Sequence, residues 1–324
     1  MMAILLVFQI SIGNTLEVKE LLRILFLIVL VGMLSLLANR GFFEATTNVL
    51  YLINFIIVLI GLFNIIFGNY RIIEGVPRLN GTYSHPNPYG MHVILTLCAF
   101  FILYKYNAIS KLKFVLFFLL GLVVFLRILN FSSIIAGFVF FGFVYVYDNQ
   151  RSRLLKMIFG VLVSLIIIYL LYLISDVFRN RMEFILETDL VANVGYAENS
   201  VQWRFLNWSY YLRNINNYVI GEGVGYSDIF FRQAHNTLFT VLAPHNEWLK
   251  VLFECGLLGL TFILCFLLYV SKNLSIPSKG LLLCYLTACF FDNFFKSTSL
   301  VLLVVILIFS MESISGGYKK QLIS

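Results

Sequence analysis

Long apolar runs, separated by short polar segments, dominate the hydrophobic pattern of the chain. About 20 mostly apolar residues let one helix cross the hydrocarbon core of a membrane, whereas the strands of a membrane barrel would alternate over about ten residues. The run lengths therefore predict helical spans. We place ten, at residues 1–12, 21–38, 48–67, 89–104, 112–128, 131–147, 155–175, 246–270, 280–295 and 299–314. The closely linked fifth and sixth runs are also compatible with a re-entrant hairpin.

The composition agrees with a membrane protein. Of the 324 residues, 60% are hydrophobic and 12% are charged, about half of the roughly 25% expected of a soluble domain. The predicted fold is an all-α, polytopic membrane helix bundle with one long extracytoplasmic loop. We divide it into residues 1–175, 176–245 and 246–324. The five cysteines all lie in apolar runs, without a CxxC pair, so we expect neither a metal site nor a cofactor.

Basic residues in short loops predict the orientation of the spans. Such loops stay in the cytoplasm, and here they carry Lys105, Lys111, Lys113, Arg151, Arg153, Lys156, Lys272 and Lys279. With ten spans, both termini are also cytoplasmic. The net charge of +7 then reflects topology and predicts no nucleic-acid partner. The extracytoplasmic side receives the loop 68–88 and the long segment 176–245.

An amphipathic helix is predicted within the long segment, near 199–219. One apolar stripe follows the helical period; it contains Val201, Phe205, Trp208, Leu212, Ile215 and Val219. Gly221 is the expected end of this helix, which we place at the membrane–water interface. Arg204 borders the stripe and Arg213 lies roughly opposite Arg204. Each arginine is either a ligand of a lipid diphosphate or an interfacial residue, snorkelling or solvated.

The start of the eighth predicted span carries the main catalytic candidate, His245. Asn246 is expected to cap this helix, and the helix dipole disfavours a charged imidazole at its N-terminus. A neutral His245 could serve as a general base, although a capping or interfacial histidine fits the same pattern. Glu254, nine residues on, is either a functional acid within the span or the partner of Lys250. Gly221 and Gly223 could present N–H groups to a phosphate or form a plain turn.

A second polar cluster lies in "RLNGTYSHPNPYG", residues 78–90. Gly81, Pro86 and Pro88 predict a turn that presents His85 and Asn87 before the fourth span. The predicted topology places this turn on the same side as His245. An ordinary rigid turn is the alternative interpretation.

Taken in order, these clusters resemble the bacterial O-antigen ligase and O-antigen polymerase superfamily. The resemblance rests on Arg78, Gly81, Pro86 and Asn87, then on Arg204, Trp208, Gly221 and Gly223, and finally on His245, Asn246, Leu249, Gly256 and Gly259. It covers mainly residues 78–90 and 199–260. The chain departs from the family in a middle span, where Ile134 follows Ser132 and Ser133 in place of an arginine. Arg127 is expected to take over that phosphate contact.

The resemblance implies a glycosyltransferase of the bacterial inner membrane that uses neither a nucleotide sugar nor a metal. Its donor and acceptor would be undecaprenyl-diphosphate-linked oligosaccharides, and its further partners membrane lipids, a chain-length regulator and a flippase. His245 and Arg204 would be catalytic; Arg78, His85, Asn87, Arg127, Arg213, Gly221, Gly223, Asn246 and Glu254 would bind substrate. The short chain and compact loop favour a polymerase of O-antigen or capsule repeat units. An O-antigen ligase and a glycan transporter or flippase are the alternatives.

Overall fold

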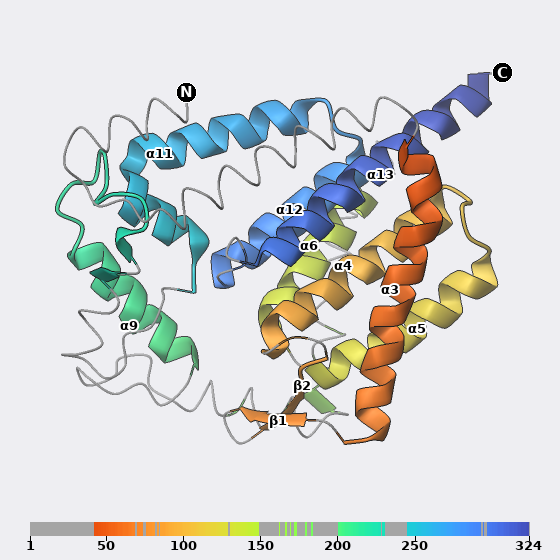
Figure 1. Cartoon of the computed structure of the whole chain (residues 1–324), viewed down its shortest axis with the longest axis horizontal. Coiled ribbons are helices and arrows are strands. Elements are labelled where there is room, and N and C mark those ends of the chain that lie inside the picture. The colour runs from red at the N-terminus through yellow and green to blue at the C-terminus, as the bar shows by residue number, and fades with distance from the viewer. Residues whose placement is uncertain are drawn as a thin grey trace. The chain divides into compact units, whose positions relative to one another are not determined.

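The computed structural model is mostly helical (Figure 1). It describes residues 42–68, 70–73, 76–81, 83, 85–128, 130–148, 200–227, 229–230, 245–292, 294 and 297–323, and single positions at 162, 166, 169, 172, 173, 179 and 183. The described residues form two compact units. Unit 1 takes those of Arg181–Asn273 and Cys289–Asn293, and unit 2 those of Met33–Asn180, Leu274–Ala288 and Phe294–Ser324. The three-part division made from the sequence stays a prediction.

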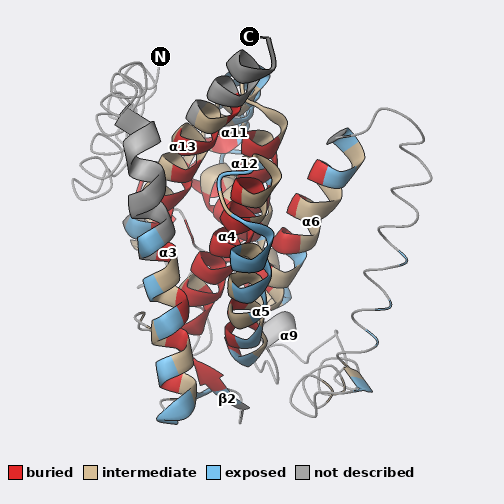
Figure 2. Cartoon of the chain, turned by 90° about the vertical axis from the view of Figure 1, so that its right-hand side faces the viewer, coloured by how far each residue is buried: buried red, intermediate tan, exposed pale blue. Residues whose placement is uncertain are grey.

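Unit 2 is a helix bundle built around one buried helix, α4 (Pro86–Lys105). The other helices are α3 (Phe42–Ile66), α5 (Lys111–Ile128), α6 (Phe131–Asp148), α12 (Ile276–Phe291) and α13 (Thr298–Ile323). The last three residues of α12 belong to unit 1. α4 packs against α3, α5, α6 and α13, and Figure 2 shows it as the most continuously buried helix. By contrast, α3 and α5 expose rows of large apolar side chains. This arrangement suits a bundle whose outer surface faces lipid.

A short antiparallel hairpin precedes α4, which corrects the prediction of a purely helical chain. β1 (Tyr70–Ile73) pairs with β2 (Val76–Leu79), so that Arg71 lies opposite Arg78. Its β-branched Ile and Val residues, with two connecting positions that include Gly75, are typical of a hairpin. The segment was too short and too polar to stand out beside the long apolar runs.

Pro86 and Pro88 lie in the first turn of α4. The sequence had predicted a turn before the helix at these positions. Pro86 occupies the first helical position and Pro88 lies in the first turn. The first four N–H groups of a helix have no intrahelical acceptor, so the missing proline N–H loses no hydrogen bond there. His85 is the N-cap, and its Nδ1 accepts from the Asn87 N–H at 3.3 Å. The helix therefore starts three residues before the predicted span.

Unit 1 contains α9 (Ser200–Arg213) and α11 (Glu247–Lys272). The amphipathic helix exists, but it ends at Arg213 and does not continue to Val219 as the stripe predicted. The chain then forms turns through Gly221, Gly223 and Gly225, all with positive φ. α11 is interrupted at Gly256 (φ 62°, ψ −168°), and Figure 1 shows the change of direction. Asn246 caps α11 as predicted, since its Oδ1 accepts from the Leu249 N–H at 3.0 Å.

Seven of the ten predicted apolar runs coincide with described helices. Two of these helices qualify as candidate membrane spans. Among the described residues, α4 and α11 are long and apolar enough to cross a membrane by length and composition. The predicted spans 1–12, 21–38 and 155–175 lie outside the described residues, apart from single positions in the last. The ten-span topology stays a prediction.

α12 begins four residues before its predicted span, because the Glu312 carboxylate accepts from the Ser275 N–H at 2.7 Å just before this helix.

Candidate functional site

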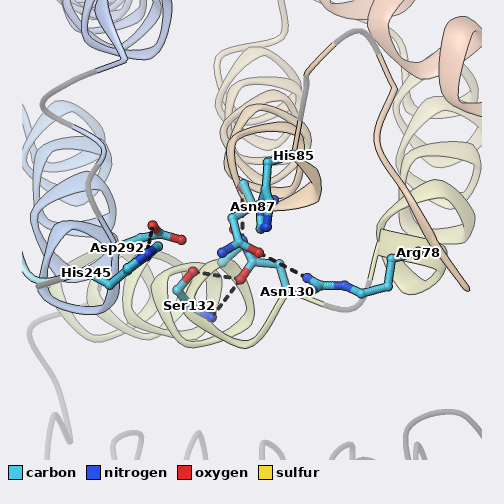
Figure 3. A network of polar contacts seen from close by, with 8 residues as sticks. Arg78, His85, Asn87, Asn130, Ser132, His245 and Asp292 are labelled. Atoms are coloured by element: carbon cyan, nitrogen blue, oxygen red, sulfur yellow. Dashed lines mark hydrogen bonds and ion pairs between the residues drawn. The ribbon is translucent and has the colours of Figure 1, made fainter. Parts of the chain in front are cut away.

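His245 forms an ion-pair-type contact with Asp292 in unit 1 (Figure 3). The distance from His245 Nδ1 to Asp292 Oδ1 is 2.9 Å. An ionised carboxylate can only accept a hydrogen bond, so the imidazole donates from Nδ1. Nε2 is then the nitrogen with a lone pair. A carboxylate that fixes the tautomer in this way leaves the opposite nitrogen available as a proton acceptor.

The backbone and a neighbouring aromatic ring also hold His245 in place. Its φ is +46°, a left-handed conformation that few residues other than glycine adopt. The Trp203 ring lies edge-on to the imidazole, with ring centroids 5.0 Å apart. The His245 side chain retains 29% exposure, against 8% for Asp292. A largely buried acid therefore orients an accessible imidazole, as a general base requires.

The glycine-rich turns of unit 1 supply the backbone groups that the interruption of α11 leaves unpaired. The Glu222 and Gly223 N–H groups donate to the carbonyls of Phe253 and Glu254, each at 2.9 Å. The Leu257 and Leu258 N–H groups donate to the carbonyls of Tyr218 and Val219, at 2.8 and 3.0 Å. We call these four hydrogen bonds the helix-break contact. Backbone groups need such partners wherever water is excluded.

The approach of the two backbones in this contact requires glycine at Gly221 and Gly256. Both have positive φ, at 76° and 62°. A Cβ on Gly221 would lie 2.5 Å from the Gly256 nitrogen. The N–H groups of Gly221 and Gly223 already donate to the carbonyls of Asn217 and Glu254. The structure thus gives these glycines a role in backbone packing, and phosphate binding by them stays an untested prediction.

Glu254 takes part in a buried polar cluster on the same helix. Its Oε1 lies 3.6 Å from Lys250 Nζ and accepts from the Ser227 hydroxyl. Glu254 and Lys250 are buried to more than nine tenths. The i, i+4 pairing named as the alternative for Glu254 is therefore present. Ser227 ties this pair to the segment that follows the glycine-rich turns.

Arg78 is the centre of a buried clamp in unit 2 (Figure 3). Its Nε donates to the Ile128 carbonyl at 2.9 Å, and its Nη2 donates to Asn87 Oδ1 at 3.1 Å. The residue is 2% exposed. The guanidinium thereby joins β2, the end of α5 and the start of α4. In this structure Arg78 acts on the protein backbone, and its proposed contact with diphosphate is not tested.

Asn130 extends the clamp to the start of α6. Its Nδ2 donates to the Asn87 carbonyl at 3.0 Å and to Ser133 Oγ at 2.9 Å. Its Oδ1 accepts from the Ser132 hydroxyl at 2.7 Å. Ser132 and Ser133, the pair singled out in the sequence, therefore serve this hydrogen-bonded link between α4 and α6. Arg127, one residue before the Ile128 carbonyl, has an exposed side chain.

The predicted site residues fall into two groups, one in each unit. In unit 2, Arg78, His85 and Asn87 are joined by hydrogen bonds at the start of α4. In unit 1, Asn246 follows His245, while Gly223 contacts the Glu254 main chain. Arg204 and Arg213 both lie on α9, where Arg204 follows Trp203 and Arg213 is exposed. The second histidine–asparagine pair, His235-Asn236, lies outside the described residues.

The sequence reasoning missed three residues that take part in the contacts described above: Asp292, Asn130 and Trp203. Asp292 interrupts "CFFDNFF", and a single acid inside a predicted apolar span is a signal that could have identified it. Asn130 separates two apolar runs in the same way. Trp203 carried no usable signal, because its contact with the imidazole depends on the packing of α9 against another segment. Each missed residue pairs with a partner more than 40 positions away.

Comparison with known families agrees with the resemblance found in the sequence. The family model described as O-antigen ligase matches residues 127–264, consistent with the O-antigen ligase and polymerase superfamily. The match begins at Arg127 and includes Arg204, His245 and both glycines of the helix-break contact. Members of this family are membrane glycosyltransferase-like enzymes that act on lipid-linked glycans. No curated protein matches the chain.

Proposed function

We propose that this protein polymerises undecaprenyl-diphosphate-linked oligosaccharide repeat units into a surface polysaccharide. The single observation that carries the proposal is the His245–Asp292 pair, which lies at the capped start of α11 and whose histidine is within the matched segment. A donor and an acceptor of the same lipid-linked class would meet there. The runs of apolar side chains on the helices would hold the isoprenoid part of both.

The proposed step exchanges one carbon–oxygen bond for another. The acceptor hydroxyl oxygen bonds to the anomeric carbon of the donor sugar, while the bond from that carbon to the diphosphate oxygen breaks. His245 Nε2 takes the hydroxyl proton, and Asp292 stabilises the imidazolium that results. The electron pair of the broken bond leaves with the diphosphate. A cation near that diphosphate lowers the energy of the developing charge.

Arg204 is the proposed diphosphate ligand, because it follows Trp203, the residue whose ring contacts His245. A guanidinium can donate two parallel hydrogen bonds to phosphate oxygens, which a lysine cannot. The contacts of Arg127 and Arg213 with the diphosphate, which the resemblance implies, stay predictions; both side chains are exposed. Asn246 and Glu254 would fix the start of α11, and the substrate contacts that the resemblance implies for Arg78, His85 and Asn87 of unit 2 stay predictions.

The same proposal places the protein in the bacterial inner membrane as a multi-pass chain. Both termini would be cytoplasmic, and the His245 side would face the extracytoplasmic space. A chain-length regulator and a flippase are the proposed partners in the pathway. Reporter fusions at residues 150 and 230 should then report opposite sides of the membrane. Fusions reporting the same side would refute this topology.

A second candidate is the ligase reaction, favoured by the description of the matching family. The bond changes would be the same, but the acceptor would be the lipid A-core. The two reactions differ in what a loss of activity leaves on the cell surface. A polymerase defect leaves single repeat units attached to the surface glycan acceptor, whereas a ligase defect leaves none attached.

The test replaces His245 in the full-length protein. His245→Ala in a deletion strain should leave single repeat units, and the purified variant should not extend a synthetic polyprenyl-diphosphate-linked repeat unit. Asn216→Ala, an exposed residue of unit 1, is the control and should support normal chain lengths. Surface glycan without any attached repeat would favour the ligase. A normal chain-length distribution for His245→Ala would remove this histidine from the mechanism.

A further inference from the structure

α9 has a buried face and an exposed apolar edge; the edge is part of the stripe predicted from the sequence, whereas Trp208 of the same stripe packs on the unit 1 core. Asn207 and Tyr211 are buried, whereas Phe205 and Leu212 are 51% and 40% exposed. Phe205 and Leu212 are seven residues apart, so they lie on the same side of the helix. Phe205 and Leu212 together form an apolar edge along α9.

The position of α9 along α11 indicates what that surface contacts. Tyr211 and Ile215 pack on Leu249 and Phe253, which belong to the first two turns of α11. The large exposed apolar side chains of α11 begin beyond this contact, at Leu257, and continue to Val270. α11 is one of the two described helices with the length and composition of a membrane span. α9 thus packs on the end of a candidate span, where the membrane–water interface is expected.

The arginines beside this apolar edge also fit a position at the membrane–water interface. At about 100° per residue, Arg204 and Arg213 project from opposite borders of the Phe205–Leu212 face. Arg213 is exposed and ends the helix. Helices that lie in the plane of a membrane have this pattern, with aromatic and leucine side chains toward the acyl chains and basic residues near the headgroups. The apolar face and its basic borders are complementary to an anionic phospholipid surface.

We infer that α9 is a membrane-surface helix, with Phe205 and Leu212 inserted below the headgroups and Arg213 contacting phospholipid phosphates. Trp203, on the same helix, contacts the imidazole of His245. Contact of α9 with lipid would therefore hold His245 at a fixed depth relative to the membrane surface. The inference does not depend on the reaction, because it concerns lipid and not the glycan substrate.

Photo-crosslinking of the full-length protein in phospholipid nanodiscs tests this inference. p-Benzoylphenylalanine replaces Phe205 or Leu212, one at a time, and phospholipid adducts are measured by mass spectrometry. Leu264, an exposed apolar residue of α11, is the positive control position, and Asn216, an exposed polar residue after α9, is the negative one. Both α9 positions should give lipid adducts at a level near that of Leu264 and well above that of Asn216.

The lipid composition distinguishes a charged surface from a merely apolar one. Adducts at Leu212 should increase by up to about fivefold when phosphatidylglycerol replaces phosphatidylcholine, the effect expected for one basic residue near an anionic surface. Arg213→Gln should remove that increase. Crosslinks to another segment of the chain, or no adducts at Phe205 and Leu212 while Leu264 reacts, would overturn the inference. Equal yields in both lipids would overturn the Arg213 contact.

Discussion

Gly221→Ala tests whether the helix-break contact depends on the close approach of two backbones. The alanine Cβ would lie 2.5 Å from the Glu254 carbonyl carbon and 2.5 Å from the Gly256 nitrogen. The φ of 76° adds strain of about 1 kcal/mol for an L residue. Since both neighbouring atoms belong to the backbone, no side-chain rotation can make room.

The magnitude follows from the hydrogen bonds that must give way. Relief of the clash would separate Gly221 from α11 and weaken the four bonds of the helix-break contact, each worth about 0.5–1.5 kcal/mol. Together with the backbone strain, loss of all four bonds would destabilise the protein by about 3–7 kcal/mol. That is a large part of the stability of a typical domain.

A matched alanine substitution serves as the control. Gly142 lies inside α6, and a Cβ there would meet nothing within 4 Å. Gly142→Ala should therefore stabilise the protein by up to about 1 kcal/mol through helix propensity. Thermal unfolding of both variants in the same detergent gives the comparison. A midpoint for Gly221→Ala within a degree or two of the unsubstituted protein would refute the reasoning.

Three further substitutions test the other contacts. Asp292→Asn should lower the transfer rate about 10- to 150-fold, the loss expected for one hydrogen bond to a charged group, because an amide can donate to Nδ1 and select the other tautomer. An unchanged rate would show that Asp292 does not orient His245. Arg78→Lys should destabilise the protein by about 1–3 kcal/mol, because a lysine cannot reach both the Ile128 carbonyl and Asn87 Oδ1; Arg71→Lys, at the exposed position opposite, should have almost no effect on the melting temperature. Burial raises the pKa of Tyr83, against a smaller lowering by its hydrogen bond with Ser299. The folded state therefore favours the neutral phenol, and this contribution is present below about pH 10 and is lost as the pH rises above it; Tyr83→Phe should reduce the loss of stability measured at high pH, and an identical pH dependence would contradict this assignment.

The hydrophobic pattern alone was sufficient to predict most of the described helices. α5 and α6 match their predicted runs to within a residue at each end, because an apolar run bounded by polar residues leaves little choice of boundaries. The end of α9 was predicted wrongly. Ile215 and Val219 continued the apolar period, yet Ile215 is buried against α11 and Val219 accepts a hydrogen bond from Leu258. Contacts with a distant segment overrode the local periodicity there.

The candidate site was partly predictable for a related reason. His245 and Asn246 were found because a cap and a helix start are adjacent in the sequence, and local rules describe them. Asp292 was not assigned, because its role comes from a partner 47 positions away. The same limit applied to the backbone contact of Arg78, because its acceptor at Ile128 lies 50 positions away; a contact of Arg78 with diphosphate stays a prediction.

The sequence by itself determined that this chain is mostly helical and rich in long apolar runs, and it identified histidine, arginine and glycine motifs that resemble those of a superfamily. These properties depend on composition, short-range periodicity and residue order. Only the tertiary structure decided which groups neutralise or pair with one another: Asp292 with His245, Ser227 with Glu254, and the glycine-rich turns with the interruption of α11. The physical reason is that buried polar groups must be paired, and the chain satisfies them with residues far apart in sequence.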